Sequence, residues 1–106
     1  MSNLVIKQSV NSKIVMVFDT ETSGLPKKRP GTYFSSYQDT EMYNMCRLVQ
    51  FSGIIYDFDI NETLAEFDYT IKPEGFVITN SNIHGITTDI ANTNGIKINT
   101  LFEKII

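Results

Sequence analysis

The 106-residue chain contains one cysteine, one histidine and no long apolar run. A single thiol, Cys46, cannot form an internal disulfide, and with one histidine it does not make a zinc site. The apolar runs, such as residues 14–18, are far shorter than the roughly 20 residues that a membrane span needs. The opening MSNLVIKQSV also lacks the charged start and continuous apolar stretch of a secretory signal. We therefore expect a soluble intracellular protein of the cytoplasm or nucleus, with no membrane partner.

Net charge is also low. Nine basic and 12 acidic residues give a formal charge of -3, which excludes a protein that grips nucleic acid by its overall charge but allows a local basic patch. The chain is 42% hydrophobic and 20% charged, which is an ordinary balance for a globular domain. Its length suits one small domain with a core of its own.

Three strands are expected from the hydrophobic pattern. Residues 14–18 are uniformly apolar and rich in β-branched side chains, which is typical of a central strand covered on both faces. Residues 48–56 are rich in strand-forming side chains, and residues 64–72 alternate between apolar and polar. The last two segments predict an antiparallel hairpin with one polar face. Residues 24–45 show neither the helical nor the strand periodicity of apolar residues, which predicts a long surface loop.

Two helices are expected after the hairpin. Thr87 is placed to cap the first helix, with Asp89 in its first turn and Gly95 at its end. The second helix is predicted to open at Thr100, where Glu103 completes a capping-box pattern. The chain stops soon afterwards, so we expect residues 1–106 to be the N-terminal portion of a single, incomplete domain, with residues 1–12 as a leader.

Two acids, Asp19 and Glu21, follow the first apolar run. Residues two apart on a strand point to the same face, so the two carboxylates are expected side by side, with Thr20 turned away. Two anions held that close favour either a shared proton or a bound cation, and hard oxygen ligands suit Mg²⁺ or Mn²⁺ together with substrate phosphates. The following Thr22-Ser23-Gly24 turn can present backbone N–H groups to a phosphate or a sugar hydroxyl.

The string FDTETSGLP resembles the first motif of the DEDD (DnaQ-like) superfamily of 3′–5′ exonucleases. Three further stretches, RLVQFSGIIYD, EFDYTIKPEG and NIHGITTD, resemble later landmarks of that family in the same order. The resemblance implies an α/β, RNase H-like mixed sheet, in which the first three strands form an antiparallel meander followed by helices. It also places the later strands beyond Ile106.

The resemblance implies a two-metal hydrolysis of phosphodiester bonds at the single-stranded 3′ ends of DNA or RNA. Asp19 and Glu21 match the first pair of catalytic metal ligands, which hold two Mg²⁺ or Mn²⁺ ions in the complete site. Candidate substrate-binding residues by the same resemblance are Thr20, Thr22, Leu25 and His84. Leu25 matches a residue that wedges under the terminal base, although a turn residue tucked into the core is an equal reading.

The later carboxylates and the catalytic histidine of the family have no match here, so the 106-residue chain alone is expected to be inactive. His84 matches the HGIT landmark, which favours a structural or substrate-flanking role over that of general base. One alternative is a non-catalytic nucleic-acid-binding or interaction module with the same half-fold. Another is an aspartyl-nucleophile phosphatase, which Glu21 and the HGIT segment disfavour. The oligomeric state is open.

The long loop offers two further candidate features for nucleic-acid binding. Lys27, Lys28 and Arg29 form a basic run that either contacts phosphates or is simply solvated. Aromatic side chains interleave with polar ones farther along the loop, where they either stack on single-stranded bases or pin the loop to the core. These aromatic residues are Tyr33, Phe34, Tyr37 and Tyr43.

Overall fold

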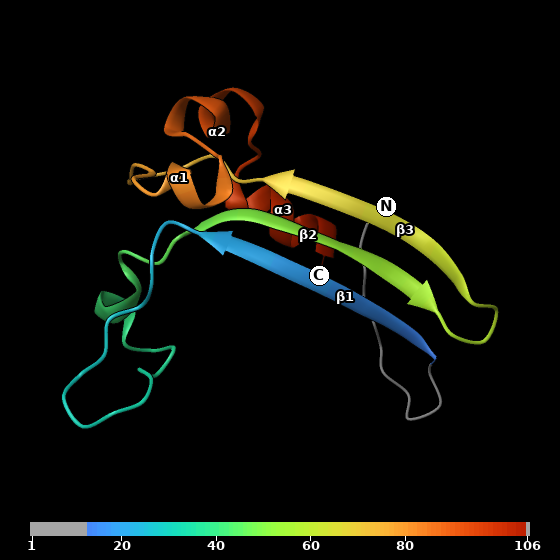
Figure 1. Ribbon diagram of the computed structural model, residues 1–106, viewed down its shortest axis with the longest axis horizontal. Helices are drawn as coiled ribbons and strands as arrows, with labels where there is room; N and C mark the ends of the chain where they lie inside the picture. Colours follow the sequence, from blue (N-terminus) through green and yellow to red (C-terminus); the bar gives the residue numbers. More distant parts are fainter. Residues whose placement is uncertain (1–12, 106) are drawn as a thin grey trace.

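A three-stranded antiparallel sheet forms the centre of the computed structural model, which describes residues 13–105. The strands are β1 (Ile14–Thr22), β2 (Leu48–Asp57) and β3 (Glu62–Thr70), and they lie in the order β1-β2-β3 (Figure 1). Four helical elements complete the described chain: the short 3₁₀ helix η1 (Thr40–Tyr43), α1 (Ser81–His84), α2 (Thr88–Asn94) and α3 (Ile98–Ile105). The predicted hairpin and meander are confirmed.

β1 differs from expectation in length and position. It continues through both acids to Thr22, because its backbone pairs with β2 from Ile14 onward until a register shift between Glu21 and Thr22. Within residues 13–105 it is an edge strand, with Val17 58% and Phe18 54% exposed, so the prediction of a strand covered on both faces is wrong for this part of the chain. An apolar run shows what a strand can bury, but its neighbours decide how much it does bury.

One face of the sheet carries the larger apolar core. Phe51, Ile71 and Leu101 are its buried members, and α3 contributes Leu101. Aromatic rings from the three strands continue this core across the sheet, because Phe51 stacks on Phe18 with ring centroids 5.1 Å apart and on Phe67 at 5.4 Å. Stacked aromatic pairs contribute about 0.5–1.5 kcal/mol beyond their buried area. Figure 1 shows α3 on this side of the sheet and no helix in front of the other side.

A smaller apolar cluster lies at the end of the sheet where β1 and β3 end. It joins the buried side chains of Val49, Ile78, Ile86 and Ala91, with Phe76 packed against them. Figure 1 shows α1 and α2 at this end of the sheet. The cluster therefore attaches the helical segment to the beginning of β2.

The first predicted helix is confirmed. The Thr87 side chain accepts a hydrogen bond of 3.1 Å from the main-chain N–H of Ile90, and the N–H of Gly95 closes the helix on the Ala91 oxygen at 2.8 Å. Capping of this kind satisfies N–H groups that have no partner inside the helix.

The prediction that the second helix opens with a capping box at Thr100 is wrong. α3 begins two residues earlier, at Ile98, and the N–H of Leu101 donates to the Lys97 oxygen at 3.1 Å. Apolar residues at positions 98, 101, 102 and 105 follow the helical spacing, so packing against the sheet starts the helix before Thr100.

Candidate functional site

Asp19 and Glu21 lie in the second half of β1, on the face of the sheet opposite α3. In the register with β2, Asp19 is opposite Ser52 and Glu21 is opposite Gln50. The neighbouring Phe18 belongs to the aromatic row on the other face. Strand alternation therefore brings the two carboxylates to one face, and no helix of the described chain covers them (Figure 1).

Both carboxylates lack a basic partner within residues 13–105. The salt bridges in this part of the chain join Arg29 to Asp39 and Glu41, and neither the Asp19 nor the Glu21 side chain has a hydrogen-bond partner there. Asp19 is exposed and Glu21 is half-buried. Two unpaired oxygen ligands on one face fit one side of the coordination shell of Mg²⁺ or Mn²⁺.

The remaining ligands of such a shell are not supplied by the described residues. Residues 13–105 contain no group of three or more histidine, cysteine, aspartate or glutamate side chains placed to hold a metal ion. Asp68 of β3 lies in the same sheet row as Asp19 and Ser52, but its carboxylate accepts a hydrogen bond of 2.8 Å from the Gln50 side chain. Among the described residues the site is thus a carboxylate pair.

The turn after the acids is tied to the start of β2. The Ser23 N–H donates to the Arg47 oxygen at 2.8 Å, and the Ser23 hydroxyl accepts from the Arg47 N–H at 3.0 Å. A Cβ atom at Gly24 would lie 2.6 Å from the Met45 oxygen, so only glycine fits this close approach. The Thr22 hydroxyl donates to the Gly24 oxygen at 2.9 Å, which commits it to the turn.

Two of the candidate substrate-binding residues, Leu25 and Thr20, lie apart from the carboxylate face of β1. Leu25 is 85% exposed, which rules out the reading that it is tucked into the core. Thr20 is opposite Phe51 in the register, on the face away from Asp19 and Glu21. Contact with a nucleic acid stays a prediction for both residues.

His84 is connected to the end of β1 through Asn80. Its Nδ1 accepts from the N–H of Ile86 at 3.1 Å, and its Nε2 lies 3.1 Å from the Asn80 Oδ1 atom. The Asn80 amide in turn donates to the Thr22 oxygen at 3.0 Å. Sequence reasoning missed Asn80, although its spacing of four residues from His84 is the one that brings two side chains together on a helical turn.

The long loop between β1 and β2 is an organised structure. The Arg29 guanidinium donates to Asp39 at 2.6 and 3.1 Å, and this hydrogen bond, with help from the Arg29 charge, holds the pKa of the Asp39 carboxyl below its usual value. Tyr43 donates to the oxygen of Ser35, whose own hydroxyl bonds to the Lys27 oxygen at 3.0 Å. Arg29 and Tyr43 therefore hold the loop together, while Lys27 and Lys28 are exposed.

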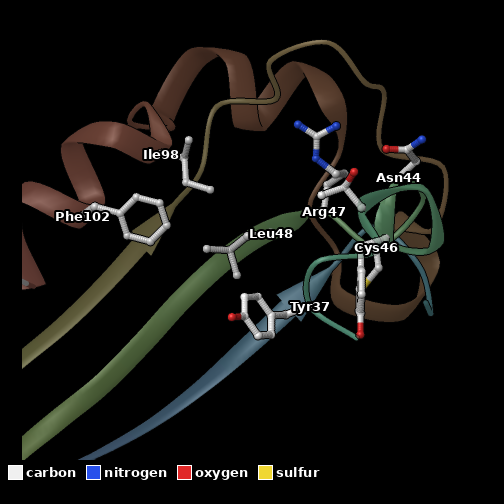
Figure 2. A pocket seen from close by; sticks show the side chains of 9 residues that line it. Tyr37, Asn44, Cys46, Arg47, Leu48, Ile98 and Phe102 are labelled. Atoms are coloured by element: carbon white, nitrogen blue, oxygen red, sulfur yellow. The ribbon is translucent and has the colours of Figure 1, made fainter. Parts of the chain in front are cut away.

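An open pocket of about 650 Å³ lies between this loop, the start of β2 and α3. Figure 2 shows Tyr37 entering it from the loop, Leu48 from β2, and Ile98 and Phe102 from α3. Tyr37 is 83% exposed and Phe102 44% exposed, so both rings are accessible. Arg47, also at the pocket, places its guanidinium 4.8 Å from the centre of the Phe76 ring.

The overall arrangement resembles part of two solved structures. One is described as SSB/Exonuclease I in complex with the inhibitor CFAM, with a TM-score of 0.55 and 21% sequence identity over 82% of this chain. The other, an ExoI/SSB-Ct complex, has a TM-score of 0.55 and 20% identity over the same share. Neither a protein-family profile nor a curated protein matches the sequence.

The likeness is one of fold. The chain shares with the matched structures an α/β arrangement in which a three-stranded antiparallel sheet is followed by helices, which confirms the predicted fold class. It spans 16% of the length of each matched chain. No helix among residues 13–105 combines the length and apolar character needed to cross a bilayer.

Proposed function

We propose that this chain is part of a metal-dependent 3′–5′ exonuclease that hydrolyses phosphodiester bonds at DNA or RNA ends. The observation that carries the proposal is the pair Asp19 and Glu21, which lie unpaired on one face of β1 within a fold resembling part of Exonuclease I. A solvated strand end would place polar side chains here too. It would not require two carboxylates on the same face without a basic partner.

In this proposal Asp19 and Glu21 hold the metal through their carboxylate oxygens. A bound Mg²⁺ or Mn²⁺ supplies charge stabilisation at the scissile phosphate and activates a water molecule. The turn at Thr22–Gly24 fixes the orientation of the end of β1, which carries the two acids. Because the described residues provide only this pair, we expect the 106-residue chain to bind metal weakly and to be inactive on its own.

The loop is proposed to bind the single strand. Lys27 and Lys28 are exposed and free to contact phosphates, whereas Arg29 is engaged by Asp39. Tyr33, Phe34 and Tyr37 are all at least 80% exposed, so their rings are available for stacking on bases. Tyr43, by contrast, serves the loop itself through its bond to Ser35.

The metal assignment is tested by titrating the chain with Mn²⁺ and following amide signals by NMR. The paramagnetic ion should broaden the signals of residues 18–22 first, and Asp19→Asn or Glu21→Gln should abolish that effect. Asp59→Asn is the matched control, because it removes the same charge at the β2–β3 turn. Broadening that starts elsewhere, or that survives both substitutions, would contradict the assignment.

The activity is tested on the product of the full reading frame that encodes this sequence. A 5′-labelled single strand should be shortened stepwise in Mg²⁺, and terminal 3′ phosphorothioates should slow the shortening. Asp19→Asn should abolish it and Asp59→Asn should not. Equal shortening by wild type and Asp19→Asn would rule out the exonuclease assignment.

A second candidate function is a non-catalytic nucleic-acid-binding module with this half-fold. The observation that favours it is the exposed aromatic loop, together with the absence of a third metal ligand among residues 13–105. It predicts binding to single strands that is unchanged by EDTA and by Asp19→Asn. Loss of all binding in EDTA would count against it.

A further inference from the structure

α1 and the end of β1 are joined by a chain of hydrogen bonds that runs through two side chains. The Ile86 N–H bonds to His84, His84 bonds to Asn80, and Asn80 bonds to the Thr22 oxygen, with distances of 3.1, 3.1 and 3.0 Å. Asn80 and Thr22 are 58 positions apart in the sequence. The contact therefore links two distant segments at the residue that directly follows Glu21.

The donor and the acceptor of each hydrogen bond follow from the chemistry of the two groups that it joins. A backbone N–H only donates, so His84 Nδ1 accepts from Ile86 and carries no hydrogen. The hydrogen of the neutral ring is then on Nε2, which donates to the Asn80 Oδ1 atom. The Asn80 amide nitrogen is left to donate to the Thr22 oxygen. Each group has one consistent role.

The backbone around His84 supports this arrangement. Gly85 has a φ of 78°, a left-handed conformation that glycine adopts without strain, and it turns the chain so that the next N–H points back to the ring. Ile86 is buried in the smaller apolar cluster together with Val49. The histidine is thus held from the core side while Asn80 reaches β1.

We propose that Asn80 and His84 are a positioning pair that holds the end of β1, and with it Glu21, in the orientation needed to bind metal. This inference rests on the proposed function of Asp19 and Glu21. Because both ring nitrogens are engaged within the protein, His84 acts through Asn80 on the strand end. The ring has one fixed tautomer, and its role is to position Asn80.

The first test needs no metal. Hydrogen exchange of the Ser23 amide, which is bonded to the Arg47 oxygen, reports whether the strand end is fixed. Asn80→Ala and His84→Ala should speed this exchange by about 2- to 10-fold, as expected for one lost hydrogen bond. Asn82→Ala, on the exposed side of α1, is the matched control and should leave it unchanged. Unchanged exchange in the Asn80 and His84 variants would overturn the proposal.

The second test compares metal affinity with stability. Asn80→Ala and His84→Ala should weaken Mn²⁺ binding at residues 18–22 by about 2- to 10-fold. His84→Gln, which can place an amide donor near the Nε2 position, should restore part of the affinity. If the variants lower only the free energy of unfolding and leave the Mn²⁺ affinity unchanged, the pair is structural and the positioning role is wrong.

The two tests separate this inference from the proposed function. If wild-type chain shows no Mn²⁺ effect at residues 18–22, the metal assignment of the acids fails, and Ser23 exchange still decides whether Asn80 and His84 fix the strand end. The ¹⁵N shifts of the His84 ring give an independent check, because they must show hydrogen on Nε2 and none on Nδ1. The opposite tautomer would contradict the proposed hydrogen bonds from Ile86 to His84 and from His84 to Asn80.

Discussion

The Cζ atom of Phe67 lies 2.8 Å from the position that a Cβ atom would take at Gly53. Gly53 is opposite Phe18 on one side and Phe67 on the other in the sheet register, so the ring of Phe67 occupies the space of its missing side chain. The glycine thereby allows the aromatic rows on β1, β2 and β3 to approach each other.

Gly53→Ala should destabilise the fold by about 1–3 kcal/mol, since an added methyl group must displace a packed ring and approach the neighbouring strand. Chemical denaturation of the two proteins would measure the change. Ser52→Ala, one residue earlier and on the other face, should change the free energy of unfolding by less than about 0.5 kcal/mol. Equal effects of the two substitutions would show that packing over Gly53 is not the cause.

Thr87→Ala should lower stability by about 1 kcal/mol, because the Ile90 N–H loses its hydrogen-bond acceptor at the start of α2. Thermal unfolding followed by circular dichroism is the measurement. Thr87→Ser keeps the hydroxyl and is expected to retain most of the stability. The cap is unimportant if Thr87→Ser and Thr87→Ala unfold at the same temperature.

Asp39 should titrate below its usual range, because Arg29 bonds to its charged form. A carboxyl whose folded pKa is depressed contributes stability above its unfolded pKa, about 3.9, and loses that contribution as the pH falls through the lower, folded value. The Asp39 carboxyl ¹³C shift should therefore move at a lower pH in wild type than in Arg29→Gln. Glu41→Gln removes the longer contact of 3.7 Å between Glu41 and Arg29, and it should change the titration midpoint of Asp39 less than Arg29→Gln does. The same midpoint in wild type and Arg29→Gln would contradict the assignment.

Tyr37→Ala should weaken binding of a single-stranded oligonucleotide by about 1–3 kcal/mol if the ring stacks on a base. Fluorescence anisotropy with a labelled oligothymidine at low salt would measure the affinity. Phe58→Ala removes another exposed ring, near the β2–β3 turn, and should have no effect. Equal losses in both variants would indicate a general change in the fold.

Replacing Lys27 and Lys28 by alanine should reduce the salt dependence of that binding. Each phosphate contact on a single strand contributes about -0.7 to the slope of log affinity against log salt concentration. Loss of both contacts should therefore make the slope shallower by about 1.4. An unchanged slope would show that the two lysines are only solvated.

Local patterns were sufficient to predict several elements of the fold. The alternation along residues 64–72 placed Phe67, Tyr69 and Ile71 on the core face, where all three belong to the larger apolar core. The same period of two gave the shared face of Asp19 and Glu21, because strand geometry fixes it whatever surrounds the strand.

Features set by distant neighbours were not visible in the sequence. The edge position of β1 depends on which strands pair with it, and the start of α3 depends on packing against the sheet. The bond from Asn80 to Thr22 joins segments 58 positions apart, so no local pattern shows it. His84 carried a signal in the HGIT motif, but its partner could be found only from the folded chain.

The parallel bridge between Ile71 and Ile96 has a consequence for the tolerance of insertions. The Lys72 N–H donates to the Ile96 oxygen at 2.8 Å and the Ile96 N–H donates to the Thr70 oxygen at 2.9 Å, so the chain closes on itself at this point. The segment between Lys72 and Ile96, which contains α1 and α2, is therefore a loop whose two ends are held together. The entropic cost of closing such a loop rises only slowly with its length. Insertions of exposed residues in this segment should therefore leave the α3 interface in place.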